Sequence, residues 1–294
     1  MINSISITTS NRYPGGGGYV ITDQLALAYA NELSSVEGYT LTNVEAESID
    51  NFCKRIKGED PAYANFGDAE IFNQAQGLQI SPMLGDTLGT KKYNLMDPSS
   101  TSLQQTYVGG CTANYDGVTT NGVNGYINSN IIADNFAGLD SSSACVGNVL
   151  RDSTSRWDFG NYATNSGFEG NLWRRMGTGV SSYGRSWCLD NAVGGGGNDD
   201  NQGHTWINLF ALPSEGENYH NGVLESTNSQ YLRPSAFSQL VLPFGGVNVN
   251  GNTFAQASNT MMFGHYFSGL NPTMVPVWST IVDDFMNELG KKTW

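Results

Sequence analysis

The chain has 294 residues, of which 39% are hydrophobic and 11% aromatic, and its formal net charge is −13. The acidic balance argues against nucleic acid or anionic lipid as the main partner, and the aromatic content excludes a disordered chain. No run approaches the ~20 apolar residues of a membrane span. The first ten residues lack the basic start and apolar core of a signal peptide, so we expect folding in the cytoplasm where the chain is made.

Residues 1–20 are predicted to be an N-terminal arm with a glycine-rich hinge. Apolar and polar residues alternate from Ile2 to Ser10 as in a short strand, and four glycines follow at positions 15–18. An arm of this kind either docks on a neighbouring subunit or frays, and both interpretations stay open.

Residues 21–91 are predicted to be a helical and irregular segment. Thr22 or Asp23 can cap a first helix. The apolar positions of this helix are Leu25, Ala28, Tyr29 and Leu33.

The pattern predicts a second helix that Asn43 caps and Gly58 ends. Its apolar face consists of Ile49, Phe52, Cys53 and Ile56. The stretch from Pro61 to Gly89 is irregular, with one further short helix around Asp68–Gln76.

Residues 92–294 are predicted to form a sandwich of short strands with a C-terminal helix. About ten to fourteen short segments separated by turn residues favour a mainly β, two-sheet jelly roll. The expected strands include Ser142–Leu150, Arg156–Tyr162, Leu172–Met176, Arg185–Asp190, Thr205–Leu212, Gly222–Ser226 and Leu240–Val249.

The C-terminal helix is expected to begin with Asn271 as its cap and Pro272 in its first turn. Gly290 ends it. An apolar stripe at helical spacing consists of Val275, Trp278, Val282, Phe285 and Leu289. The stripe is expected to pack on the chain's own sheet.

Turn chemistry is densest between Tyr93 and Asn128. The Asn121-Gly122 and Asn124-Gly125 steps tolerate the positive φ angles of tight hairpins and bulges. This run predicts antiparallel strands and contains no reaction chemistry.

One acidic motif has the spacing of a glycosidase site. Glu45, Glu47 and Asp50 match the E-x-[DE]-x-x-[DE] spacing of jelly-roll glucanases, in which a strand directs the carboxylates into one cleft. Here they lie within a helical pattern, where they serve as acids near a helix N-terminus. The chain is therefore expected not to be an enzyme, with a laminarinase-like hydrolase kept as an alternative.

Four scattered cysteines (Cys53, Cys111, Cys145 and Cys188) favour buried free thiols, and the three histidines have no zinc-ligand spacing with them. Calcium is the one cofactor for which the sequence offers ligands. The candidate oxygen donors are Asp190, Asp199 and Asp200, with Asp116 and Asp134 as weaker ones. Acidic loops of this kind are common as plain turns, and the spacing is not that of an EF-hand, so a plain turn is the favoured interpretation.

Four tryptophans of the strand region can stack on sugar rings or pack in the core. They are Trp157, Trp173, Trp187 and Trp206. A carbohydrate-binding module is therefore a second alternative function.

A series of short motifs carries a family resemblance over roughly Glu45 to Lys292. The motifs are YNLMDP (93–98), TYVGG (106–110), DGVTTNGVNGYINS (116–129), YHNGV (219–223), GGVNVNGN (245–252), FGHYFSGL (263–270) and NELGKK (287–292). In this order they resemble the concanavalin A-like, or laminin-G-like, jelly-roll domain of structural proteins in tailed bacteriophages, including crAss-like phages and related prophages.

The resemblance implies a structural component of a virion, such as a capsid decoration, head-fibre or tail-fibre-type subunit. It implies attachment to other virion proteins, for which the arm of residues 1–20 is the expected place. A homo-oligomer, with a trimer favoured, and a host-surface glycan are further expected partners. The resemblance supplies no catalytic residues.

Overall fold

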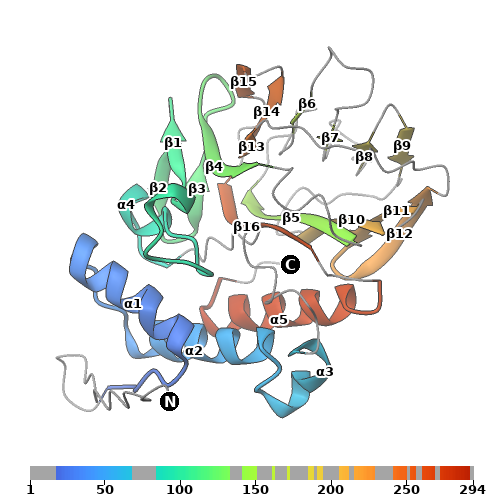
Figure 1. Cartoon of the computed structure of the whole chain (residues 1–294). Helices are drawn as coiled ribbons and strands as arrows, with labels where there is room; N and C mark the ends of the chain where they lie inside the picture. The colour runs from blue at the N-terminus through green and yellow to red at the C-terminus, as the bar shows by residue number, and fades with distance from the viewer. Residues whose placement is uncertain are drawn as a thin grey trace, which may run out of the picture.

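The computed structural model describes residues 18–67, 84–132, 141–150, 161–162, 171–172, 185–188, 191–194, 205–211, 215–228, 241–249, 252–255, 260–268 and 272–291. Three long helices, α1 (Gln24–Glu37), α2 (Asn43–Ile56) and α5 (Val275–Glu288), lie together on one side of the molecule. The strands occupy the other side (Figure 1). The described part of the chain is thus mainly antiparallel β structure on a helical base, with one parallel pair, β14 and β6.

Helix α1 begins after Asp23, which is one of the two caps that the sequence predicts. The Asp23 side chain accepts hydrogen bonds from two amides of the first turn, and Gly38 ends the helix in the left-handed conformation. The predicted apolar face is partly wrong, because Ala28 is exposed. The buried residues are Ala26, Tyr29, Ala30 and Leu33.

Helix α2 has the predicted apolar face but a different cap. The cap is Thr42, whose side chain accepts from the Glu45 amide while the Glu45 carboxylate accepts from the Thr42 amide. Asn43, which we expected to be the cap, is the first helical residue. Its side chain accepts a hydrogen bond from the Tyr19 amide instead.

The predicted irregular stretch contains short helical turns. These are η1 (Pro61–Tyr63), α3 (Ala64–Gly67) and α4 (Leu88–Lys91), and η4 (Thr101–Leu103) follows. The helix expected around Asp68–Gln76 lies outside the described residues.

Helix α5 buries its whole predicted stripe, from Val275 to Leu289. It starts at Val275, four residues beyond the expected cap, and Met274 precedes it without a side-chain cap. Pro276 rather than Pro272 occupies the first turn, where a missing backbone N–H costs nothing. Asn271 lies outside the described residues.

Aromatic side chains join α2 to α5. The ring of Phe52 lies 4.7 Å from that of Phe285 and 5.9 Å from that of Trp278, and Phe66 stacks on Trp278 at 5.9 Å. At the edge of this contact, Arg55 pairs with Glu288 at 2.6 Å. Burying such rings is the largest apolar contribution that an interface of this kind offers.

In the described ranges the strands form one large sheet and three small ones. The seven-stranded sheet has the order β12-β11-β10-β5-β16-β3-β2, and the others are β1-β4-β13, β15-β14-β6 and β7-β8-β9. The bounds are β1 (Thr106–Val108), β2 (Thr112–Asn114), β3 (Gly117–Thr119), β4 (Tyr126–Ile132), β5 (Ser141–Leu150), β6 (Asn161–Tyr162), β7 (Asn171–Leu172), β8 (Arg185–Cys188), β9 (Asn191–Gly194), β10 (Thr205–Ala211), β11 (Glu215–His220), β12 (Val223–Asn228), β13 (Val241–Phe244), β14 (Gly246–Val249), β15 (Asn252–Ala255) and β16 (Thr260–Ser268).

The centre of the large sheet joins distant parts of the chain. Strands β5 and β16 pair in antiparallel register, with Cys145 opposite His265 and Ser142 opposite Ser268. The expected strand Leu240–Val249 is divided into β13 and β14 at Gly245, which has a φ of +72°. Helices and strands share one hydrophobic core, which includes Tyr29, Ile49, Val118, Met261 and Trp278.

Candidate functional site

The glycosidase-like acidic motif lies on helix α2, and two of its three members have structural contacts. Glu45 is buried and accepts hydrogen bonds from the Thr42 hydroxyl and amide and from the Tyr39 hydroxyl. Asp50 is completely buried, and Glu47 is exposed. The three carboxylates therefore do not share one face of a strand, which is the arrangement that the motif requires.

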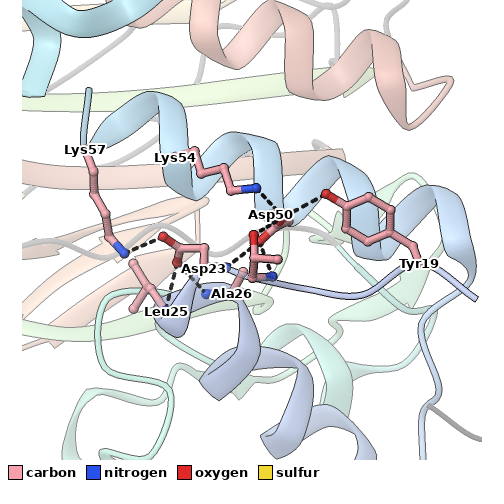
Figure 2. Close-up of polar contacts among 8 residues, drawn as sticks. Tyr19, Asp23, Leu25, Ala26, Asp50, Lys54 and Lys57 are labelled. Atoms are coloured by element: carbon pink, nitrogen blue, oxygen red, sulfur yellow. Dashed lines mark hydrogen bonds and ion pairs between the residues drawn. The ribbon is translucent and has the colours of Figure 1, made fainter. Parts of the chain in front are cut away.

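Asp50 is the centre of a polar cluster that holds the start of the described chain against α2 (Figure 2). Its carboxylate accepts from the Tyr19 hydroxyl at 2.7 Å, the Thr22 amide at 3.0 Å and the Asp23 amide at 2.7 Å. It also pairs with Lys54, one helical turn later, at 2.7 Å. We call this cluster the Asp50 anchor; its members are Tyr19, Thr22, Asp23, Asp50, Lys54 and Lys57.

Asp23 extends the anchor into helix α1. One carboxylate oxygen caps the helix by accepting from the Leu25 and Ala26 amides, at 2.8 and 3.1 Å. The other oxygen pairs with Lys57, beyond the end of α2, at 2.6 Å. A single side chain thereby links the beginning of one helix to the end of the next, as Figure 2 shows.

The hydrogen bonds of the anchor stabilise the charged form of Asp50. Burial acts to raise the pKa of this carboxyl, but bonds from Lys54, the Asp23 amide and Tyr19 outweigh it and lower the pKa below its usual value. Burial, followed by the bond to Asp50, raises the pKa of the Tyr19 hydroxyl. Asp50 is therefore an ionised acceptor and Tyr19 a protonated donor at neutral pH.

The anchor fixes Tyr19, Thr22 and Asp23, which lie at the C-terminal end of the predicted arm and directly after it. Tyr19, Thr22 and Asp23 are each bonded to a residue in the middle of a packed helix. Residues 1–17, which include most of the predicted arm, directly precede this fixed segment. Each carboxylate of the anchor is already held by several donors within the chain, so the anchor has a structural role.

The asparagine-rich loop of the resemblance motif is also held by its own side chains. The Asn121 carboxamide oxygen accepts from the amides of Val123, Asn124 and Gly125, at 2.8–3.0 Å. Gly109 approaches Asn124 so closely that an added Cβ would lie 2.1 Å from its carbonyl oxygen. Val123, at the tip of this loop, is 80% exposed.

The structure does not test the predicted calcium and sugar sites. Asp190, Asp199 and Asp200 lie outside the described residues, as do Asp134, Trp157 and Trp173. Trp187 lies on β8 and Trp206 on β10, in different sheets. Asp116 lies in the turn between β2 and β3. Both predictions therefore stay predictions.

Sequence reasoning missed two pairs of buried polar residues. Glu217 and Tyr219 lie two residues apart on β11, and the Tyr219 hydroxyl donates to the Glu217 carboxylate at 2.6 Å. Lys91 and Lys291 are 0% and 3% exposed. Alternation along β11 could have revealed the first pair, whereas nothing local distinguishes these lysines from Lys92 and Lys292.

Within the described ranges, no helix is long and apolar enough to cross a membrane. The same part of the chain contains no group of three or more histidine, cysteine or acidic side chains placed to hold a metal ion. Of the four predicted free thiols, Cys53 is buried and free, and Cys111 is half-buried and free.

Comparisons with known proteins give only distant structural likenesses. No family model matches the sequence, and no curated protein matches it. The chain is similar to the receptor-binding domain of a botulinum neurotoxin C/D mosaic serotype, with 10% identity and a TM-score of 0.43 over 60% of this chain and 46% of that one. The binding domain of serotype C1 gives 10% identity and 0.43, over 60% of this chain and 47% of that one.

The chain thus spans less than half the length of these neurotoxin domains. TM-scores below 0.5 at such identity support no inference about function, so the functional argument depends on the chain's own residues.

Proposed function

We propose that this chain is a structural subunit of a bacteriophage virion, which attaches through its N-terminal arm and displays a lectin-like β-sandwich. The observation that carries the proposal is the Asp50 anchor. It supports the attachment role because it fixes the base of the arm on a helical platform. A load applied to the arm would pass through four hydrogen bonds to Asp50, in the middle of α2.

The strand arrangement supports a jelly roll as the displayed domain. The seven-stranded sheet supplies one layer. The sheets β1-β4-β13 and β15-β14-β6 adjoin where β13 continues into β14 at Gly245, and we propose that they form the second layer. Pairing of β5 with β16 also fits, since jelly rolls join strands that are far apart in sequence.

The structural contacts of the acidic motif support a role without catalysis. Glu45 belongs to a helix cap and Asp50 to the anchor, so the residues that suggested a glucanase have structural work. The asparagine-rich resemblance motif likewise builds a turn. In this proposal the partners are other virion proteins, and copies of the chain associate with one another, as a trimer, at the particle surface.

The arm can be tested separately from the fold. We expect a chain lacking residues 1–17 to keep its melting temperature, because the Asp50 anchor begins at Tyr19, and to lose binding to particles depleted of the native subunit. A chain with residues 2–10 scrambled is the matched control for length and composition. If both altered chains rebind as well as the native one, the arm is not the attachment element.

A further inference from the structure

Two exposed apolar side chains lie in a part of the chain that has almost no charge. Between Asp97 and Asp134 the sequence contains one charged residue, Asp116. Val108 and Val123 are exposed within this stretch and have no charged residue within three positions. The other exposed large hydrophobic residues of the described ranges all lie within three positions of an acid; they are Val20, Val36, Val44, Tyr115, Val223 and Leu224.

The two valines come from neighbouring segments. Val108 ends strand β1, and the residues that follow it lie against the loop that carries Val123. The Gly110 amide donates to the Asn124 carboxamide oxygen at 3.1 Å, and a Cβ added to Gly109 would lie 2.1 Å from the Asn124 carbonyl oxygen. We call this surface the neutral face. Its members are all exposed; they are Thr106, Val108, Gly109, Asn121, Val123 and Asn124.

The one charged residue of the stretch lies at the other end of strand β2. Asp116 is in the turn after β2, whereas the neutral face adjoins the residues before β2. The neighbouring Tyr115 hydroxyl donates to the Leu289 carbonyl oxygen, at the C-terminal end of α5, at 3.1 Å. Asp116 attracts Lys291 beside it. Asp116 therefore belongs to the contact with α5, and none of the six residues of the neutral face carries a charge.

The loop that carries Val123 is held in one conformation by its own groups. The Asn121 carboxamide oxygen accepts from three successive amides, and its NH2 group donates to the Asn124 carboxamide oxygen at 2.8 Å. Val123 is 80% exposed at the tip of this loop. An exposed side chain that is already fixed loses little conformational freedom on binding, so the loop is preorganised to present an apolar contact.

The chemistry of the neutral face fits a second copy of this chain. Side chains of asparagine and threonine both donate and accept hydrogen bonds, so this surface is able to pair with itself, which a surface of one charge sign is not. Copies that each have a net charge of −13 repel one another least where uncharged surfaces meet. A basic partner, by contrast, would be attracted to acidic parts of the surface.

Strand β1 adds a backbone edge to the same surface. Among the described strands it pairs with β4 alone, so it is an edge of its sheet. An edge strand presents N–H and C=O groups that another chain is able to pair with. The neutral face therefore offers apolar contact, neutral hydrogen-bonding side chains and backbone groups together.

We propose that the neutral face is the surface through which copies of this chain associate. The inference rests on the proposed function, which includes association of the copies as a trimer, and it adds the residues that make the contact. Val123 is the apolar centre of this contact, and the hydrogen bonds of Asn121 hold it in place.

Sedimentation equilibrium of the full chain and of two variants tests the neutral face. We expect Val123→Asp to weaken association by about tenfold or more, because it places a carboxylate in a contact between acidic copies. Val36→Asp is the matched control: it adds the same charge at a valine that is 59% exposed on α1, and it should leave association unchanged. Thermal unfolding of both variants checks that each is folded.

Hydrogen exchange of the native chain at several concentrations gives an answer that depends on no variant. Residues 106–110 and 121–126 should be protected in concentrated solution and should lose this protection on dilution, whereas helix α1 should not change. Dissociation of a dimer by Val123→Asp would support the neutral face and contradict the trimer. An oligomer that Val123→Asp leaves intact would overturn this inference alone. A native chain that stays monomeric at every concentration would overturn both.

Discussion

Asp50 is a single buried carboxylate that accepts hydrogen bonds from many donors. It has no exposed surface, yet it accepts from two side-chain hydroxyls, two amides and one ammonium group. A buried charge is tolerated only with this degree of pairing. The same property makes the residue sensitive to a change that preserves its shape.

The Asp50→Asn substitution should lower the free energy of unfolding by about 3 kcal/mol. The carboxamide oxygen can accept from the Thr22 and Asp23 amides, but the NH2 group would then face the Lys54 ammonium, which is also a donor, and the negative charge would be lost. Urea denaturation at pH 7 measures this. Glu47→Gln, an exposed change on the same helix, should cost less than about 0.5 kcal/mol.

The Asp50 deficit should shrink in acid. The pKa of Asp50 is lowered in the folded state, so its contribution is present above the unfolded value of about 3.9 and is lost as the pH falls through the folded one. A deficit equal at pH 7 and pH 2 would contradict the charged role of Asp50.

At the scale of elements, the cap of helix α2 provides hydrogen-bond partners for two groups of Glu45, its backbone amide and its carboxylate. Thr42→Ala should cost about 1–2 kcal/mol, because it removes the acceptor of the Glu45 amide and one donor to a buried carboxylate. Thr42→Ser should be nearly neutral in thermal unfolding, since serine caps as well as threonine. An equal cost for both variants would mean that the methyl group, not the hydroxyl, is needed.

The turn between β1 and β2 can be tested with two glycines that share the same φ of +67°. Gly38→Ala introduces only backbone strain, about 1 kcal/mol, because no atom lies within 4 Å of the new Cβ. Gly109→Ala adds a collision with the Asn124 backbone and should cost about 1–3 kcal/mol more. Equal melting temperatures for the two variants would show that the loop yields without cost.

The sequence predicts helix faces better than helix starts. The stripe of α5 follows from its spacing, because an amphipathic helix has one way to bury it. Thr42 and Asn43 are both able to cap a helix. Thr42 is the cap here because the Glu45 side chain accepts a hydrogen bond from its backbone amide. Pro272 and Pro276 are both compatible with a first turn, so the start of α5 depends on packing.

Contacts between distant segments were not predictable in this way. The bonds from Tyr19, Thr22 and Asp23 to Asp50 join residues that are 27–31 positions apart, and no local pattern predicts them. Turn residues predicted β5 and β10 nearly to the residue. They contained no information that β5 pairs with both β10 and β16.

For the whole molecule, stability should rise with pH from about 7 to 9.5. The lowered pKa values of Lys91 and Lys291 require this sign, although self-repulsion of an acidic chain acts in the opposite direction. Above about pH 10 stability should fall, because the pKa values of buried Tyr29 and partly buried Tyr107 are raised and unfolded tyrosines ionise there. Calorimetry of the native chain and Lys291→Met over this range measures both limbs. A decline in the stability of the native chain from pH 7 onward would contradict the lowered pKa values of Lys91 and Lys291.

The proposal of a virion subunit depends on the helical base, the anchored start of the described chain and the β-rich body. The most direct measurement of that proposal is quantitative mass spectrometry of virus particles purified from cells that produce the chain. The account predicts a fixed, symmetry-compatible ratio of this chain to the major capsid or tail subunit, preparation after preparation. Particles that are complete and infectious but lack the chain would contradict it.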